Sequence, residues 1–221
     1  MPRMFLCALA VMAPLISGLA MGQNLLQNSS FEEADGTVPK PWYAEDWRTG
    51  GKAAVATGDA AQGQRCVTLS ASRDDQRAGW RQDVPFAGGL AVYEGSMRTR
   101  GMREAEKKGA SVRLCFRDEK KETGLAQAFF PPSEKWQRVR HVFPVPAGTK
   151  TIGVELLHWF TPGETGWDDV SLRAGGEKEM ADYIKEHLDV KPGPTQKPYH
   201  PADGQIVEVT PPPFIDRKSV V

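Results

Sequence analysis

GETGWDDVSLR, residues 163–173, joins a glycine-rich turn to an alternating run and places two adjacent aspartates at the join. Successive side chains of a β-strand point to opposite faces, so Asp168, Val170 and Leu172 would share one face, and Asp169 and Ser171 the other. The pattern predicts a half-buried strand with the Asp168 carboxylate turned towards the buried side at its entrance. A carboxylate in that place has to be paired, hydrogen-bonded or bound to a metal ion, because an unpaired buried charge is costly.

Short alternating runs of the same kind, separated by Gly, Pro and Asp, fill the chain before residue 175. This pattern is typical of an all-β sandwich or barrel. Many short strands have to close or stack to hide their edges, so we expect a two-sheet β-sandwich of the jelly-roll type. The expected strands cover residues 24–31, 53–57, 65–70, 78–84, 91–99, 111–117, 126–130, 136–145, 151–158 and 166–173.

The two ends of the chain depart from this pattern. Residues 1–22 carry one arginine, then an apolar run and small residues, which predicts a secretory signal peptide cleaved after Ala20 or Gly22. After the signal peptide we expect three segments. They are a β-sandwich over residues 23–174, a short helix and a Pro/Gly linker over residues 175–198, and the start of a truncated second domain over residues 199–221. A disordered tail is the alternative for the last segment.

Composition limits the possible partners. The formal net charge of the whole chain is zero, so no bulk field would draw nucleic acid or an anionic membrane. After the leader no stretch is long and apolar enough to cross a bilayer. We therefore expect a secreted or periplasmic monomer that has no membrane contact after cleavage. Export permits a disulfide between Cys66 and Cys115, but two cysteines make no disulfide framework, and we expect them to stay unpaired.

The N-terminal run NLLQNSSFEE, residues 24–33, offers a partner for Asp168. The two ends of a domain often lie close together, and Phe31, which we expect to point inward, is followed by Glu32 and Glu33. A hard cation such as Ca²⁺ takes several carboxylate and carbonyl oxygens. Either glutamate could hold a structural calcium ion together with Asp168. The alternative is that Asp168 accepts backbone N–H bonds and that Glu32 is solvated.

Four segments occur in the order of a known family. They are NLLQNSSFEE, WRQDVPFAGGLAVYEGSMRTRG, EKWQRVRHVFPVPAGTKTIGVEL and GWDDVSL, within residues 24–174. Together they resemble carbohydrate-binding modules of families four, nine and twenty-two, which share the galactose-binding-like jelly roll. The resemblance implies a β-sandwich, a structural calcium carried by Glu32 and Asp168 with backbone oxygens, and a glycan site on a concave face.

A second, shorter resemblance lies near the end of the chain. PYHPADGQIVEVTPPPF, residues 198–214, resembles the start of the domain that precedes the catalytic region in some heparinase-like polysaccharide lyases. It implies that the sandwich is the N-terminal part of a larger polysaccharide-active protein. The ending IDRKSVV departs from that pattern.

Candidate ligand-binding residues lie on the strand faces opposite the core hydrophobes. Guanidinium forks match carboxylate and sulfate oxygens, which favours an acidic glycan, and an indole offers a flat face to a pyranose. The candidates are Arg98, Arg100, Arg113, Arg117 and Trp159, with Gln82 added because its position in the resembling modules often reaches the site. If these strands share a sheet, one surface presents several guanidiniums and an indole. The alternative is a solvated outer face whose arginines pair with Asp and Glu.

Three further tryptophans and one histidine could lie either in the core or in a binding site. Trp42 and Trp47 fall in a loop, where they would cap the sandwich or form one wall of a binding cleft. Trp136 opens an expected strand, which favours a core position. His158 has the parity of the core, which favours a hydrogen-bonded core histidine over a ligand or base.

We therefore expect a secreted, non-catalytic carbohydrate-binding module that targets an attached polysaccharide-degrading enzyme to its polysaccharide. The sequence has no phosphate-binding loop, HExxH, CxxC pair or nucleophile elbow, so it names no catalytic residue. One alternative is a protein-interaction or adhesion sandwich, which would show an apolar surface patch. Another is a small enzyme that uses His141 or His158 with Tyr93, which would require an acid and a base in one cleft.

Overall fold

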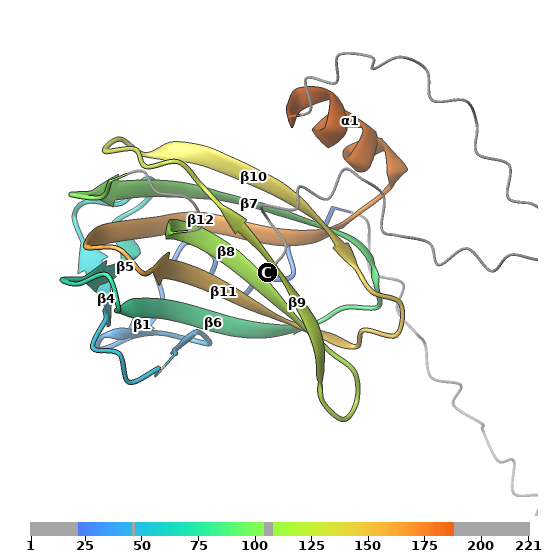
Figure 1. Ribbon diagram of the computed structural model, residues 1–221, viewed down its shortest axis with the longest axis horizontal. Helices are drawn as coiled ribbons and strands as arrows, with labels where there is room; N and C mark the ends of the chain where they lie inside the picture. The colour runs from blue at the N-terminus through green and yellow to red at the C-terminus, as the bar shows by residue number, and fades with distance from the viewer. Residues whose placement is uncertain (1–21, 46, 104–107, 188–221) are drawn as a thin grey trace, which may run out of the picture.

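A computed structural model describes residues 22–45, 47–103 and 108–187, and within them the chain forms two five-stranded antiparallel sheets packed face to face (Figure 1). We call them the β7 sheet, with the order β10-β7-β12-β5-β4, and the β11 sheet, with the order β3-β6-β11-β8-β9. The strands are β3 (Tyr43–Ala44), β4 (Lys52–Thr57), β5 (Arg65–Ala71), β6 (Arg77–Pro85), β7 (Gly89–Arg100), β8 (Gly109–Arg117), β9 (Glu122–Phe129), β10 (Gln137–Val145), β11 (Thr151–Trp159) and β12 (Gly163–Gly175). The two-residue strands β1 (Ala34–Asp35) and β2 (Val38–Pro39) pair only with each other. The expected all-β sandwich is confirmed.

The core lies between the two sheets and follows the period of two. Val112 and Leu114 of β8 and Ile152, Val154 and Leu156 of β11 are fully buried members of one apolar cluster. Every expected strand from residue 53 to residue 173 is present within a residue or a few of its expected bounds. The alternation of apolar and polar side chains predicts these strands because it is a local signal.

The expected first strand, residues 24–31, is wrong. Asn28 and Phe31 have φ angles of 46° and 59°, which extended backbone does not adopt, so the segment turns instead. The expectation that the two ends of the domain meet is nevertheless confirmed. Leu25 N donates to Leu172 O at 2.7 Å, and Val170 N donates to Ser29 O at 2.9 Å, so the N-terminal segment lies along β12.

The short helix is confirmed as α1 (Glu177–His187), which lies against β10 and β12 (Figure 1). Cys66 and Cys115 are both buried and unpaired, as expected. In the described part of the chain no helix is long and apolar enough to span a membrane. The predicted signal peptide, the Pro/Gly linker and the predicted second domain lie outside the described residues.

A β-bulge reverses the facing of Asp168. Trp167 stands opposite Met97 in the core, whereas Asp168 stands opposite Ser96 on the outer side of the β7 sheet. The register then shifts between Asp168 and Ser171, and Asp169 takes a φ of 45°. The expectation that Asp168 shares a face with Val170 and Leu172 is therefore wrong, because an extra residue in the strand breaks the period of two.

His158 is a core histidine, as its parity indicates. It has no exposed surface, its Nδ1 lies 2.9 Å from Thr165 Oγ1, and its Nε2 lies 2.6 Å from the Thr161 carbonyl oxygen. Burial lowers the pKa of this imidazole below its ordinary value of 6.5, because it disfavours the charged form. Both ring nitrogens are bonded within the fold, so the residue is not placed to act on a substrate.

Because of this histidine, we expect the free energy of unfolding to decrease as the pH is lowered. The unfolded chain takes up a proton near pH 6.5, whereas folded His158 does so only at a lower pH. The stability contributed by the neutral imidazole is thus complete above pH 6.5 and is lost as pH falls towards the lowered pKa. Urea unfolding at about pH 7.5 and about pH 5.5 should show a lower free energy of unfolding at the acid pH. A His158→Gln variant should show a smaller difference, and an equal difference in both proteins would contradict the assignment.

Candidate functional site

A row of polar side chains crosses the outer face of the β11 sheet. The strand registers set Tyr43, Arg81, Glu155, Arg113 and Gln127 side by side, one from each strand in turn. Cross-strand neighbours point to the same face, and the adjacent positions of β8 and β11 point into the core. The face turned away from the core is therefore polar along its middle.

Glu155 is the buried centre of this row, with 1% of its surface exposed. Arg113 Nε donates to its Oε2 at 2.5 Å, and Arg81 Nη1 donates to its Oε1 at 3.1 Å. Burial raises the pKa of Glu155, and the Arg113 guanidinium opposes that rise. Arg81 also pairs with Asp83 and Glu45, at 2.9 and 3.4 Å. The guanidiniums of Arg81 and Arg113 are thus neutralised within the protein.

Two tryptophans lie beside this row on the same face. Trp159 ends β11, and Trp47 comes from the loop after β3; their ring centroids are 5.8 Å apart at 88°. The Arg113 guanidinium carbon lies 5.6 Å from the Trp47 centroid and 5.0 Å from that of Trp159. The Arg77 guanidinium carbon lies 5.1 and 5.2 Å from the same two centroids. We call Trp47, Trp159, Arg77 and Arg113 the arginine–tryptophan cluster; all four are half-buried.

Gly79 lets Trp47 lie on the sheet. A Cβ at residue 79 would come within 2.7 Å of Trp47 Cη2 and 2.8 Å of Leu157 Cδ2, closer than such atoms approach. The loop is held beside β6 by backbone and hydroxyl bonds: Glu45 N donates to Gly79 O at 3.0 Å, and Arg77 N donates to Thr49 Oγ1 at 3.0 Å. The position of Trp47 therefore depends on a missing side chain in the neighbouring strand.

We expect Gly79→Ala to cost about 1–2 kcal/mol of unfolding free energy, because the added methyl group overpacks the indole. The control is Gly124→Ala in β9, where the nearest atom to a new Cβ would be Phe116 Cδ2 at an ordinary 3.8 Å. That variant should change stability by no more than about 0.5 kcal/mol. Urea unfolding of both variants checks this, and equal effects would show that Trp47 does not rest on Gly79.

The predicted ligand residues divide between the two sheets. Arg113 and Trp159 meet in the cluster, and Arg117 lies on the same face but at the far end of the sheet, opposite Thr151. Arg98 and Arg100 belong to β7, on the outer face of the other sheet. The strands do not share a sheet, so the five predicted residues do not form one surface.

Arg98 is instead part of a contact that holds a loop. It is 4% exposed, pairs with Asp59 at 2.5 Å, and its guanidinium carbon lies 4.8 Å from the Trp136 centroid. Arg100 pairs with the same Asp59. The core position expected for Trp136 is wrong, because the half-buried ring stacks on Arg98 over the outer face of the β7 sheet. Direct ligand binding by Arg98, Arg100 or Arg117 stays a prediction.

Gln82 is also not brought to the cluster. It lies on the core side of β6 with 3% of its surface exposed. Gln27 N donates to its Oε1 at 2.8 Å, and its Nε2 donates to Gln27 O at 3.0 Å. The amide therefore fastens the N-terminal segment to the sandwich. Trp42 caps the same end of the sandwich, and its Nε1 donates to Gln27 O at 3.1 Å. Trp47 does not cap the sandwich but forms part of the outer surface of the β11 sheet.

Glu32 and Asp168 both bind the chain between β4 and β5. Asp168 has no exposed surface; its Oδ2 accepts from Gln62 N at 2.8 Å and its Oδ1 from Asp169 N at 2.7 Å. Burial raises its pKa, and these amides oppose the rise. Glu32 Oε1 accepts from the amides of Gln64 and Arg65, which lower the pKa of Glu32. The alternative in which Asp168 accepts backbone N–H bonds is thus the arrangement present.

The hydrogen-bond partners of these two carboxylates in the structure are backbone amides. Calcium takes six to eight oxygen ligands, whereas amide donors face the two carboxylates. Within the described ranges no three His, Cys, Asp or Glu side chains gather in a way that could hold a metal ion. Calcium binding by Glu32 and Asp168 stays a prediction of the sequence.

Melting of the full chain with calcium and with a chelator tests that prediction. A calcium ion bound only by the folded state would raise Tm. An unchanged Tm would show that the amide contacts alone hold the loop. A Glu32→Gln variant is the control, because a shift caused by this ion should disappear when that carboxylate is removed.

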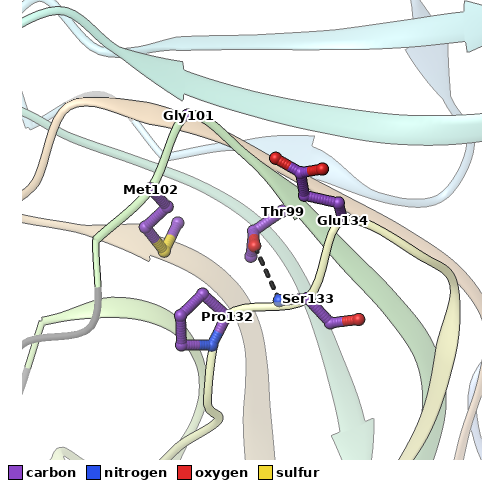
Figure 2. Close-up of a pocket in the computed structure, with 6 residues that line it drawn as sticks. All are labelled: Thr99, Gly101, Met102, Pro132, Ser133 and Glu134. Carbon is purple, nitrogen blue, oxygen red and sulfur yellow. Dashed lines mark hydrogen bonds between the residues drawn. The ribbon is translucent and has the colours of Figure 1, made fainter.

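The described part of the chain also has a small pocket at the end of β7 (Figure 2). Its volume is about 220 Å³, and its lining residues are Thr99, Gly101, Met102, Pro132, Ser133 and Glu134. Thr99 Oγ1 accepts from Ser133 N at 2.9 Å, so two polar groups of the pocket wall are bonded to each other. No aromatic ring lines it, in contrast to the cluster on the β11 sheet.

Sequence reasoning missed Arg77 and Arg81. A usable signal exists in RAGWRQDV, residues 77–84, because Trp80 and Val84 point into the core and the odd-numbered residues must then point outward. The contribution of Trp47 has no such signal, since it depends on how a loop folds back over Gly79.

No protein-family model and no curated protein matches this chain. Solved structures are similar to it. The N-terminal CBM22-1-CBM22-2 tandem domain from Paenibacillus barcinonensis aligns with a TM-score of 0.52 at 18% identity, over 71% of this chain and 48% of that one. A structure described as "Family 16 Carbohydrate Binding Module-2" aligns at 0.50 and 16% identity, over 68% and 100%.

A third similar structure is the enzymatically active domain of bacteriophage CBA120 tailspike protein 4, with a TM-score of 0.50, 12% identity and 68% of this chain covered. The aligned part spans only 21% of that domain. Identities this low show a common fold and nothing finer. The described chain thus has the jelly-roll β-sandwich fold of carbohydrate-binding modules.

Proposed function

We propose that the protein is a carbohydrate-binding module whose ligand surface is the arginine–tryptophan cluster on the β11 sheet. The observation that carries the proposal is the meeting of two half-buried indoles, Trp47 and Trp159, with a row of planar polar side chains on one sheet face. Indole faces suit the apolar side of a pyranose, and guanidinium and amide groups suit pairs of hydroxyls. The fold shared with carbohydrate-binding modules supports the same proposal.

The adhesion alternative has less support. Its expected sign is a contiguous apolar patch. Among the described residues the exposed large hydrophobic side chains are Val38 and Tyr43, each 42% exposed, and Tyr43 bonds Asp83 through its hydroxyl. The enzyme alternative loses two of its residues, because His158 is fully bonded in the core and Tyr93 has no exposed surface.

Two finer parts of the proposal rest on the sequence. The resemblance of residues 198–214 to the start of a lyase domain supports an attached polysaccharide-degrading enzyme, and the signal-peptide pattern of residues 1–22 supports export. An acidic ligand has less support from Arg113 than the sequence indicates, because its fork already binds Glu155. Arg81 is likewise paired with carboxylates.

Affinity electrophoresis of the full chain through gels that contain neutral or acidic polysaccharides tests the proposal. We expect retardation by at least one polysaccharide, and release when its soluble oligomer is added. Near-ultraviolet circular dichroism shows in parallel that the protein is folded. A folded protein that no polysaccharide retards would overturn the proposed function.

A further inference from the structure

Arg77 is the one arginine of the cluster with no carboxylate partner in the described part of the chain. Arg81 faces Asp83, Glu45 and Glu155, and Arg113 faces Glu155, each within 4 Å. Arg77 makes no such pair with any described residue; its guanidinium carbon instead lies 5.1, 5.2 and 5.7 Å from the ring centroids of Trp47, Trp159 and Phe160. Within the cluster, the positive charge that no described carboxylate neutralises is therefore that of Arg77.

The guanidinium of Arg77 is fixed and partly removed from water. Its Nε is buried and has no hydrogen-bond partner, whereas its terminal nitrogens are not among the buried, unpartnered atoms of the structure. Its backbone is held by Thr49, which accepts from Arg77 N at 3.0 Å and donates to Arg77 O at 3.1 Å. A planar cation held against aromatic rings has already lost much of its rotamer freedom. Binding of an anion would therefore cost little further side-chain entropy.

We propose that Arg77 binds an anionic group of the glycan, a ring carboxylate of a uronate residue. This inference rests on the proposed function and makes it specific. A uronate carries its carboxylate directly on the pyranose ring, so one sugar unit can place an apolar face on the neighbouring indole and a carboxylate against the guanidinium. The terminal nitrogens supply the fork that a carboxylate accepts in bidentate fashion. A sulfate ester offers similar oxygens and is separated by the test.

Isothermal titration of the full chain with paired oligosaccharides tests this assignment. Each pair consists of a galacturonate, glucuronate or mannuronate oligomer and its neutral, carboxyl-reduced counterpart; a sulfated galactan is the additional probe. We expect at least one acidic oligomer to bind about tenfold more tightly than its reduced partner. Arg77→Gln should remove that preference, so that the variant binds the acidic and the neutral oligomer of a pair with affinities within about twofold of each other. Arg77→Lys, which keeps the charge and loses the fork, should recover only part of it.

The control is Lys52→Gln, which removes the same charge from an exposed position on β4 of the other sheet. It should leave the acidic preference intact. If Arg77 gave a preference for the sulfated galactan alone, the carboxylate assignment would be wrong and the anionic group that Arg77 binds would be a sulfate ester. Binding of neutral and acidic partners with equal affinity, or a preference that survives Arg77→Gln, would overturn the inference and leave the proposed function standing. Binding of no glycan at all would overturn both.

Discussion

Replacing Trp159 with alanine is expected to weaken glycan binding by about 2 kcal/mol, roughly thirtyfold in Kd. The ring of Trp159 contacts every other member of the cluster: it lies 5.8 Å from Trp47, 5.2 Å from the Arg77 guanidinium and 5.0 Å from that of Arg113. Its removal takes away a flat apolar surface and also the support that orients both cations. Isothermal titration with the polysaccharide oligomer that retards the wild type measures the loss.

Trp136→Ala is the matched control for this prediction. Trp136 is also a half-buried tryptophan stacked on an arginine, with Arg98 at 4.8 Å, but it lies on the outer face of the β7 sheet. It should keep the wild-type Kd within about twofold. Equal losses in the two variants would mean that binding depends on general stability, and a loss in Trp136→Ala alone would move the site to the other sheet.

Replacing Glu155 with glutamine is expected to lower the free energy of unfolding by about 3 kcal/mol, at the lower end for a broken buried ion pair. Glu155 is 1% exposed, and the change leaves two guanidiniums facing a neutral amide. The side chains of Arg81 and Arg113, 11% and 14% exposed, still reach some water, so we do not expect the upper end of the range. Urea unfolding measures this change as a shift of the midpoint urea concentration, with the dependence of the unfolding free energy on urea unchanged.

Glu164→Gln is the control for Glu155→Gln. Glu164 pairs with Arg100 at 3.9 Å, and their side chains are 34% and 55% exposed, so solvent screens this pair. Its loss should cost less than about 1 kcal/mol. If both variants lost the same small amount, Glu155 would not be holding the two arginines in place.

The strands could be predicted from the sequence because their signal is local. SVRLCFR, residues 111–117, alternates, and Val112, Leu114 and Phe116 do face the core. The same rule failed at Asp168, where a residue with φ of 45° adds a bulge, and in residues 24–31, where Asn28 and Phe31 turn the chain. A local alternation carries no signal for a backbone that leaves the extended region at one residue.

The candidate site could be predicted only in part, because it depends on which strands become neighbours. Parity correctly set Arg113 and Trp159 outward, but it could not show that β7 belongs to the other sheet, which separates Arg98 and Arg100 from them. It could not show that a buried Glu155 neutralises Arg113. Nor could it place Trp47, whose contact with β6 depends on Gly79. Strand order and loop packing are long-range properties that one strand's pattern does not contain.

The most direct test of the central claim, that the cluster on the β11 sheet is the glycan surface, is a titration of the ¹⁵N-labelled full chain with the retained oligosaccharide. The indole N–H signals are observed, assigned with single Trp→Phe variants. We predict that the Trp47 and Trp159 signals shift together with one Kd while the Trp136 signal, on the other sheet, stays in place. Shifts of Trp136 with unmoved Trp47 and Trp159 signals would contradict it.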